Sequence, residues 1–366
     1  MSLSTSWGLG LAALAASAFL SGCSAAASDA AGKGDVGDAR AGTDSATDSP
    51  DGPGSDAAVS NDAAVMDGPP GIDVATGDSA PAGDAGAGYS SDGPVAYSTT
   101  SLSVSTGADS FTVNVWVPST AGAHPVVSFS PGLEQLSAGY APYATRLASW
   151  GFIVLMRDDP GILVSGDTVA TDLSYTVGTW LPAQNAMSSS VLAGKADLSH
   201  VGLAGHSRGG QVTLDAAEQG LLGKVEAWVG LDPVNTAYSA GTAPSTDLPS
   251  IGIPTLYLGA GVQTNCAPAG DDYETLYAVS PSPSIAITVV GAAHPQFEDL
   301  GNCSACLLPC SPAGTAKSQA VLALAMRYLT AFFARELLGD VSVGTLLQGA
   351  GATADEAAGV ITLTSK

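Results

Sequence analysis

The chain has 366 residues and is strongly acidic, with 34 Asp and Glu against 11 Lys and Arg, for a formal net charge of -23. This balance argues against nucleic acid as a partner, because its phosphate backbone must be neutralised by Lys and Arg side chains. The length allows one large domain or two small ones.

The first residues predict an export signal. Residues 7–20 form an apolar core, and the tetrapeptide LSGC that ends at Cys23 resembles a bacterial lipobox, in which the cysteine is lipidated and becomes the mature N-terminus. Signal peptides normally carry Lys or Arg before the core, and here there is none, so an ordinary secretory signal is the alternative. We expect a signal peptide over 1–22 and a lipid anchor at Cys23. Because Ser24 rather than Asp follows, we expect the protein at the outer membrane or cell surface.

Residues 23–94 differ in composition from the rest of the chain. Between Ser24 and Pro94 there are 13 Asp and no Glu, set among Ala, Gly, Ser and Pro. Such a segment cannot bury enough apolar surface to offset the entropy of an ordered chain. Its Asp residues also lack the spacing of a calcium-binding loop. We therefore expect a disordered tether over 23–94.

From residue 95 to the end, apolar segments of strand length alternate with helix-like segments, which indicates one α/β domain over 95–366. Continuous apolar strands separated by helices are typical of a mostly parallel sheet with helices on both faces. Ligands of such sheets bind at the carboxyl ends of the strands. The expected strands cover 111–117, 125–129, 152–156, 201–204, 227–231, 254–258 and 284–290, and the expected helices 140–150, 180–188, 211–219 and 320–338.

The hexapeptide GHSRGG at residues 205–210 lies between an expected strand and an expected helix. A strand, a sharp G-x-S-x-G turn and a helix form the nucleophile elbow of the α/β-hydrolase fold, in which the turn exposes the serine hydroxyl above the sheet. In a chain so rich in glycine and serine, the G-x-S-x-G pattern alone can occur by chance. The assignment of an elbow therefore depends on the strand before the pattern and the helix after it. We expect Ser207 to be a nucleophile.

The general base can be sought by elimination, because the chain has four histidines. His206 lies inside the elbow and points away from the serine hydroxyl, and His124 and His200 precede strands, at the opposite edge of the sheet. His294 follows the last expected strand, at the same edge as Ser207 and in the chain order Ser, acid, His of this fold. We expect His294 to be the base.

An acid has to orient the imidazole and stabilise its charge. In many α/β-hydrolases it follows the second strand after the elbow, but here that strand ends at residues 258–261 with no carboxylate immediately beyond. Asp232 directly follows the first strand after the elbow helix, and we favour it. Asp271 and Asp272, ten or more residues past the next strand, remain the alternatives.

Two backbone amides are expected to form an oxyanion hole. One belongs to Arg208, the residue after the nucleophile, and the other to the loop at 131–133, where we choose Leu133. We expect the Arg208 side chain to pair with a surface acid rather than to bind substrate. The connection from Asp232 to the next strand is only about twenty residues, too short for a cap domain.

Several segments resemble one group of hydrolases. GHSRGG at 205–210, LDPV at 231–234 and CAP at 266–268 ahead of His294 resemble the chlorophyllases. VVSFSPG at 126–132 and SWGFIV at 149–154 are similar to the wider group of chlorophyllases, bacterial cutinases and poly(ethylene terephthalate) hydrolases. The acid after the strand that follows the elbow is similar to that of the platelet-activating-factor acetylhydrolases.

This resemblance covers roughly residues 100–340. It implies an α/β-hydrolase with Ser207 as nucleophile, Asp232 as orienting acid and His294 as base. Polyester hydrolases usually have an aromatic residue where this chain has Leu133, and their acid lies one strand later. Both departures favour an esterase over a polyesterase.

Four cysteines follow Cys23, namely Cys266, Cys303, Cys306 and Cys310. An even number in an exported protein favours disulfides, whose connectivity is open among three pairings. A zinc site is the alternative, but no nearby histidine besides His294 completes its ligand set.

The sequence thus predicts a serine hydrolase that cleaves carboxylic esters through an acyl-enzyme on Ser207, with no cofactor and no metal. A small or lipid-like ester and the membrane are the expected partners, and we expect a monomer. The alternatives are a serine peptidase of the same fold and a non-catalytic surface binding module.

Overall fold

The computed structural model describes residues 88–235, 243–246, 248–299 and 310–366. All of them belong to the unit Ala82–Lys366. The expected signal peptide, the expected lipid anchor at Cys23 and most of the expected tether lie outside the described residues, as do Cys303 and Cys306. Within the part of the chain that is described, no helix is long and apolar enough to cross a membrane.

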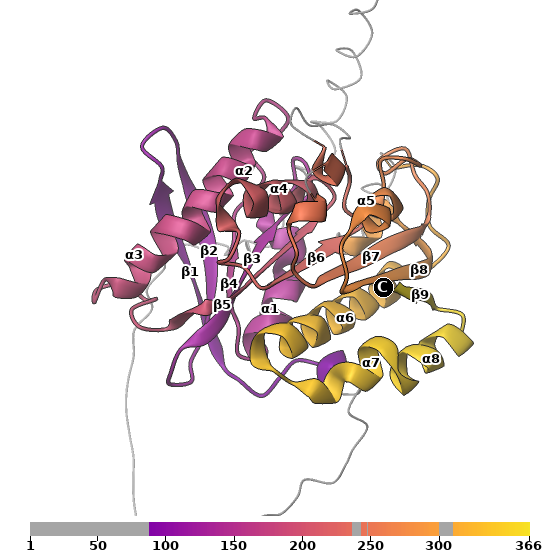
Figure 1. Ribbon diagram of the computed structural model, residues 1–366. Helices are drawn as coiled ribbons and strands as arrows, with labels where there is room; N and C mark the ends of the chain where they lie inside the picture. Colours follow the sequence, from indigo (N-terminus) through magenta and orange to yellow (C-terminus); the bar gives the residue numbers. More distant parts are fainter. Residues whose placement is uncertain (1–87, 236–242, 247, 300–309) are drawn as a thin grey trace, which may run out of the picture. The chain divides into compact units, whose positions relative to one another are not determined.

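A nine-stranded sheet runs through the domain (Figure 1), in the order β1-β2-β4-β3-β5-β6-β7-β8-β9. The strands from β4 to β8 in this order are parallel, while β1 and β2 at one side and β9 at the other are antiparallel to their neighbours. The strands are β1 (Tyr97–Ser105), β2 (Ser110–Pro118), β3 (His124–Ser130), β4 (Ile153–Met156), β5 (Ala196–His206), β6 (Ala227–Leu231), β7 (Thr255–Val262), β8 (Ser284–Ala293) and β9 (Ile361–Ser365).

Helices cover both faces of the sheet. Neighbouring residues of a strand point to opposite faces, so Val126 and Val127 of β3 enter two different apolar cores. One core contains residues of α1 and α6, and the other contains residues of α2 and α4. The helices are α1 (Ala141–Ser149), α2 (Gly166–Tyr175), α3 (Leu181–Ala186), α4 (Arg208–Ala216), α5 (Tyr273–Val279), α6 (Ser318–Leu338), α7 (Gly344–Gln348) and α8 (Ala350–Ala357).

The expected α/β fold, with a mostly parallel sheet and helices on both faces, is confirmed. All residues of β3 and β6 are buried, which is why both strands carry apolar side chains on both of their faces. In the connection from β6 to β7, the described residues form two single-turn 3-10 helices, Pro244–Thr246 and Leu248–Ser250.

The structure adds elements that the apolar pattern did not reveal, among them β1, α2 and β9. The helix α2 is rich in Thr, Ser and Asp, which are modest helix formers, and it begins where the Ser165 hydroxyl caps the amide of Thr168. It continues through a π-helical turn, Thr176–Trp180, into α3. The helix expected at 180–188 is therefore the last part of a longer helical segment.

The folded domain begins earlier than residue 95, where the tether was expected to end. Tyr89 is buried, and its hydroxyl donates a hydrogen bond to Asp340 (2.7 Å). Arg146 of α1 forms an ion pair with Asp92 (2.7 Å). The composition of this stretch could not show the boundary, because Tyr89 is one apolar residue whose partners lie far away in the sequence.

Candidate active site

Ser207 lies in the sharp turn between β5 and α4, with φ 56° and ψ -126°. A Cβ atom on Gly205 would lie 2.3 Å from the backbone of Gly209, and one on Gly209 would lie 1.9 Å from the carbonyl oxygen of Ser130. Both distances are far below van der Waals contact, so only glycine fits at these two positions. The two glycines therefore allow the turn that lifts Ser207 above the sheet.

His294, the first residue after β8, forms a hydrogen bond through Nδ1 to Oδ2 of Asp232 (2.7 Å), and both side chains are buried. A carboxylate only accepts hydrogen bonds, so Nδ1 of His294 carries a proton, and Nε2 is the ring nitrogen that can act as the base. The other oxygen of Asp232 accepts from the amide of Ala260 (2.9 Å). Asp232 is thus held in one orientation by two donors.

Backbone hydrogen bonds hold Ser207 beside Asp232. The Ser207 amide donates to the carbonyl of Leu231 (3.1 Å), and the Val234 amide donates to the carbonyl of Ser207 (3.3 Å). These bonds reach the chain on both sides of Asp232. The nucleophile, acid and base candidates from the sequence therefore meet at one edge of the sheet.

The rival acids have other contacts. Asp272 is the N-cap of α5, where it accepts from the amide of Thr275 (3.1 Å), and it also accepts from the side chain of Gln263 (2.8 Å). Asp271 lies in the turn before that helix, and its carbonyl accepts from the amide of Asn235 (3.1 Å). Among the three candidates, the structure brings Asp232 to His294.

His206 joins two loops of the site through a buried chain of hydrogen bonds that the sequence did not reveal. Its Nε2 lies 3.0 Å from the carbonyl oxygen of His294 and must donate to it, so Nδ1 accepts from the hydroxyl of Tyr140 (2.7 Å). That hydroxyl oxygen in turn accepts from the amide of Gly132 (3.2 Å). Burial, and then the charge of His294, lowers the pKa of His206 well below its usual value. The ring is therefore neutral and structural.

Leu133 and Arg208 are the two residues whose backbone amides are expected to form the oxyanion hole. Leu133 lies in a tight turn in which the Gln135 amide donates to the carbonyl of Gly132 (3.0 Å). Arg208 is the first residue of α4, where a helix leaves its amides without intrahelical acceptors. Among the described residues, neither the Leu133 nor the Arg208 amide donates to a backbone carbonyl. Both donors remain available.

Backbone strain concentrates at this edge of the sheet. Within the described residues, three that are not glycine have a positive φ: Glu134 (59°), Ser207 (56°) and Asp232 (39°). One follows Leu133, one is the candidate nucleophile and one is the candidate acid. Such conformations persist only where the surrounding structure enforces them, and they cluster at functional sites.

The Arg208 side chain does not reach a surface acid, which corrects the sequence expectation. Its guanidinium is buried and pairs with the equally buried carboxylate of Asp159 (3.3 Å), in the loop after β4. It also donates to the carbonyl oxygens of Gly161 (3.1 Å) and Val164. The side chain turns under this loop because an acid and two carbonyls are available there.

One of the expected disulfides is present. Cys266 and Cys310, which are 44 positions apart, are joined by a disulfide, which links the loop after β7 to the segment beyond His294. Next to it, the amide of Asn265 donates to the carbonyl of Ser311 (2.9 Å). Cys303 and Cys306 lie outside the described residues, so their pairing stays a prediction.

The chlorophyllase family model matches residues 91–294 of the chain. This chain belongs to the chlorophyllase family. The match includes Ser207, Asp232 and His294. The family assignment confirms both the α/β-hydrolase fold and the resemblance that the sequence motifs indicated.

Curated relatives of this chlorophyllase-family chain include plant and bacterial proteins. It is 31% identical over 179 residues to "Chlorophyllase-1, chloroplastic" of Citrus unshiu, covering 44% of this chain and 51% of the relative. It is 29% identical over 196 residues to "Bis(hydroxyethyl) terephthalate hydrolase" of Streptomyces coelicolor, covering 52% of this chain and 56% of the relative. It is also 29% identical over 170 residues to "Cutinase" of Thermobifida fusca, covering 46% of this chain and 51% of the relative. The chain spans about half the length of the relatives it matches.

The buried side chain of Glu298 should make the folding stability of this chlorophyllase-family protein depend on pH. Glu298 lies four residues after His294. Burial, and then the charge of Asp299, raises the pKa of Glu298 from 4.5 to about 8. With its amide nitrogen turned towards Glu298, Gln135 donates to both carboxylate oxygens at 2.8 and 3.2 Å, which offsets part of the cost of ionisation.

Between these two pKa values the folded protein keeps a proton on Glu298 that the unfolded chain has lost, so folding stability falls as pH rises, by up to ~1.4 kcal/mol per pH unit. We expect Glu298→Gln to be more stable than the parent at pH 8, by about 1–3 kcal/mol, and the advantage to shrink towards pH 5. Urea unfolding of both proteins at pH 5, 6.5 and 8 measures the difference. An advantage that does not change with pH would contradict the assignment.

Proposed function

We propose that this chain is a serine hydrolase that cleaves carboxylic esters through an acyl-enzyme on Ser207. The observation that supports it best is the 2.7 Å hydrogen bond between His294 and Asp232, beside a serine held at the elbow. Relatives named chlorophyllase, cutinase and terephthalate hydrolase support an ester as the substrate class.

In the acylation step, the hydroxyl oxygen of Ser207 attacks the carbonyl carbon of the ester while its proton passes to Nε2 of His294. Asp232 holds the ring through Nδ1 and stabilises the imidazolium that forms. The amides of Leu133 and Arg208 donate to the oxyanion of the tetrahedral intermediate. The intermediate then expels the alcohol, which takes the proton from His294.

In the deacylation step, a water molecule gives a proton to Nε2 of His294 and attacks the acyl carbon. The same two amides stabilise the second oxyanion. Collapse of this intermediate breaks the bond to Ser207, which recovers its proton from His294, and the carboxylic acid leaves. The cycle regenerates the protein without consuming any other reagent.

The proposal is tested by labelling and turnover on one preparation. A fluorophosphonate probe should modify Ser207, as located by peptide mass spectrometry, and short p-nitrophenyl esters should be hydrolysed and should protect against the probe. A matched ester and amide distinguish an esterase from a peptidase, since a peptidase of this fold should favour the amide. Absence of both labelling and turnover would instead support a binding module.

We further propose that the protein is exported and anchored through a lipid on Cys23, at the outer membrane or cell surface. The lipobox-like sequence that ends at Cys23 supports this proposal. In a bacterial host that processes lipoproteins, an alkyne fatty acid should label the parent chain, and Cys23→Ala should abolish labelling and release the protein from the membrane fraction. Equal labelling of both proteins would contradict the anchor.

A further inference from the structure

We propose that Asp159 is a positioning residue that fixes the two oxyanion amides, those of Leu133 and Arg208, relative to each other. The inference rests on the function proposed above and goes further, because it assigns a role in that reaction to a side chain outside the triad. The observation that supports it is that the buried carboxylate of Asp159 accepts hydrogen bonds from both loops that supply these amides.

Oδ1 of Asp159 is the centre of this contact. It accepts from the amide of Glu134 (3.0 Å), the residue directly after Leu133, and from Nη1 of Arg208 (3.3 Å). It also accepts from the amide of Gly161 (2.8 Å), which closes the turn of its own loop. A shift of either oxyanion loop away from the other would therefore break a bond to this oxygen.

The backbone of Asp159 adds a second bond to the loop of Leu133. Its amide donates to the carbonyl of Gln135 (3.0 Å), so Asp159 holds the chain on both sides of the strained Glu134. A non-glycine residue at φ 59° needs such bonds to stay in place. Since Leu133 shares the turn with Glu134, the direction of the Leu133 amide depends on them.

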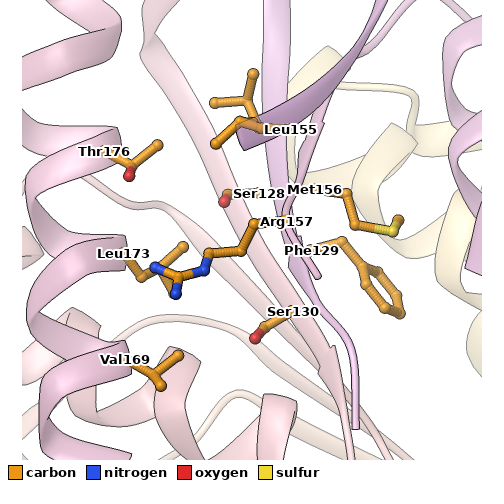
Figure 2. Close-up of a pocket in the computed structure, with 10 residues that line it drawn as sticks. Ser128, Phe129, Ser130, Leu155, Met156, Arg157, Val169, Leu173 and Thr176 are labelled. Atoms are coloured by element: carbon orange, nitrogen blue, oxygen red, sulfur yellow. The ribbon is translucent and has the colours of Figure 1, made fainter. Parts of the chain in front are cut away.

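The loop that carries Asp159 is itself anchored to the body of the domain. Figure 2 shows Arg157 reaching from the end of β4 towards the helix that carries Leu173. There its guanidinium pairs with the buried Asp172 (3.0 Å), and it lies 3.8 Å from the centre of the Phe111 ring. Asp159 therefore projects from a fixed base rather than from a free loop.

Stability alone does not account for this arrangement. Burial raises the pKa of Asp159, against the lowering effect of Arg208, and burial lowers the pKa of Arg208. A buried ion pair is costly to desolvate, and an apolar pair of similar volume is often as stable. The carboxylate does offer one atom that can bind two loops at once, which an apolar side chain cannot.

The test compares Asp159→Ala with the neighbouring Asp158→Ala, because asparagine would keep an acceptor oxygen at either position. Asp158 binds the same loop through Oδ1, which accepts from the amide (2.7 Å) and hydroxyl (2.6 Å) of Ser137, but its side chain is exposed on the protein surface. Both variants lose one carboxylate charge and all bonds that its oxygens accept. The measurements are kcat and KM on a short p-nitrophenyl ester, the rate of fluorophosphonate modification, and Tm.

Removing one oxyanion donor costs about 10²–10³ in kcat, and a displaced donor should cost less. For Asp159→Ala we expect kcat to fall by roughly 10–100-fold with KM changed less than about twofold, and the probe to react more slowly by a similar factor. For Asp158→Ala we expect both rates to stay within about twofold. A rise in KM with unchanged kcat, or equal effects of the two variants, would overturn the proposal.

The double variant Asp159→Ala/Arg208→Met covers the case in which Asp159→Ala leaves Arg208 buried and unpaired and fails to fold. It removes both charges and keeps the Arg208 amide. If the pair acts as one positioning unit, this variant folds and its kcat lies roughly 10–100-fold below that of the parent. Parent-like kcat in the folded double variant would overturn the inference. Loss of activity in Ser207→Ala would still support the proposed function, so the two failures are distinguishable.

Discussion

Replacing Ser207 by alanine should abolish ester hydrolysis, with kcat lowered by about 10⁴-fold or more, because no other group then forms the acyl-enzyme. Alanine keeps the Cβ atom and the backbone bonds of Ser207 to Leu231 and Val234, so the elbow should keep its shape. Hydrolysis of p-nitrophenyl esters and fluorophosphonate labelling are the measurements, and both signals should vanish together.

Ser199→Ala is the matched control for this variant. Ser199 belongs to β5, the same strand that leads into the elbow, but it is exposed and bonds to Asp197 (2.5 Å) far from His294. We expect its kcat to match that of the parent within about twofold, as for most surface substitutions. Substantial turnover in Ser207→Ala would refute the proposed nucleophile, and with it the proposed function.

Replacing Asp232 by asparagine should lower kcat by about 10³–10⁴-fold with little change in KM. The Asn side chain can donate to Nδ1 of His294, which would place the ring proton on Nε2, where the base needs a free lone pair. Asparagine tolerates the positive φ of this position and can still accept from the Ala260 amide, so the fold should survive. Steady-state kinetics measure the loss of catalysis, and a melting curve shows whether the variant is still folded.

Asp272→Asn and Asp271→Asn complete this experiment. Asparagine is as good an N-cap as aspartate, so Asp272→Asn should keep the start of α5 and change kcat by less than about threefold. The same result is expected for Asp271→Asn, because asparagine keeps the backbone carbonyl that accepts from the Asn235 amide. If either variant lost activity while Asp232→Asn kept it, the acid would be assigned wrongly.

Much of the site could be predicted from local pattern and chain order. The nucleophile turn consists of consecutive residues around Ser207. In a parallel sheet, the residues that follow the strands all lie at the same edge. His294 follows from that rule, because the other histidines lie inside the elbow or near the amino ends of strands. The acid stayed open among three candidates, since sequence order does not say how far a loop travels from its strand.

Other features depend on partners that no local pattern indicates. The buried Tyr140 hydroxyl and the His206 ring meet across 66 positions, and Arg208 meets Asp159 across 49. Arg208 was expected at the surface because charged side chains are rarely buried unless they are paired. Its burial follows from the acid and carbonyls of the loop after β4, a stretch with no apolar periodicity.

By itself the sequence determined the fold class, the elbow and the order of its candidate residues, because these follow from short-range pattern and from the rule that parallel strands end together. The tertiary structure decided which acid meets His294, where the Arg208 side chain goes, and that the folded domain includes Tyr89. Each of these rests on contacts between distant parts of the chain, whose geometry is set by packing of the two cores on the sheet rather than by any neighbouring residues.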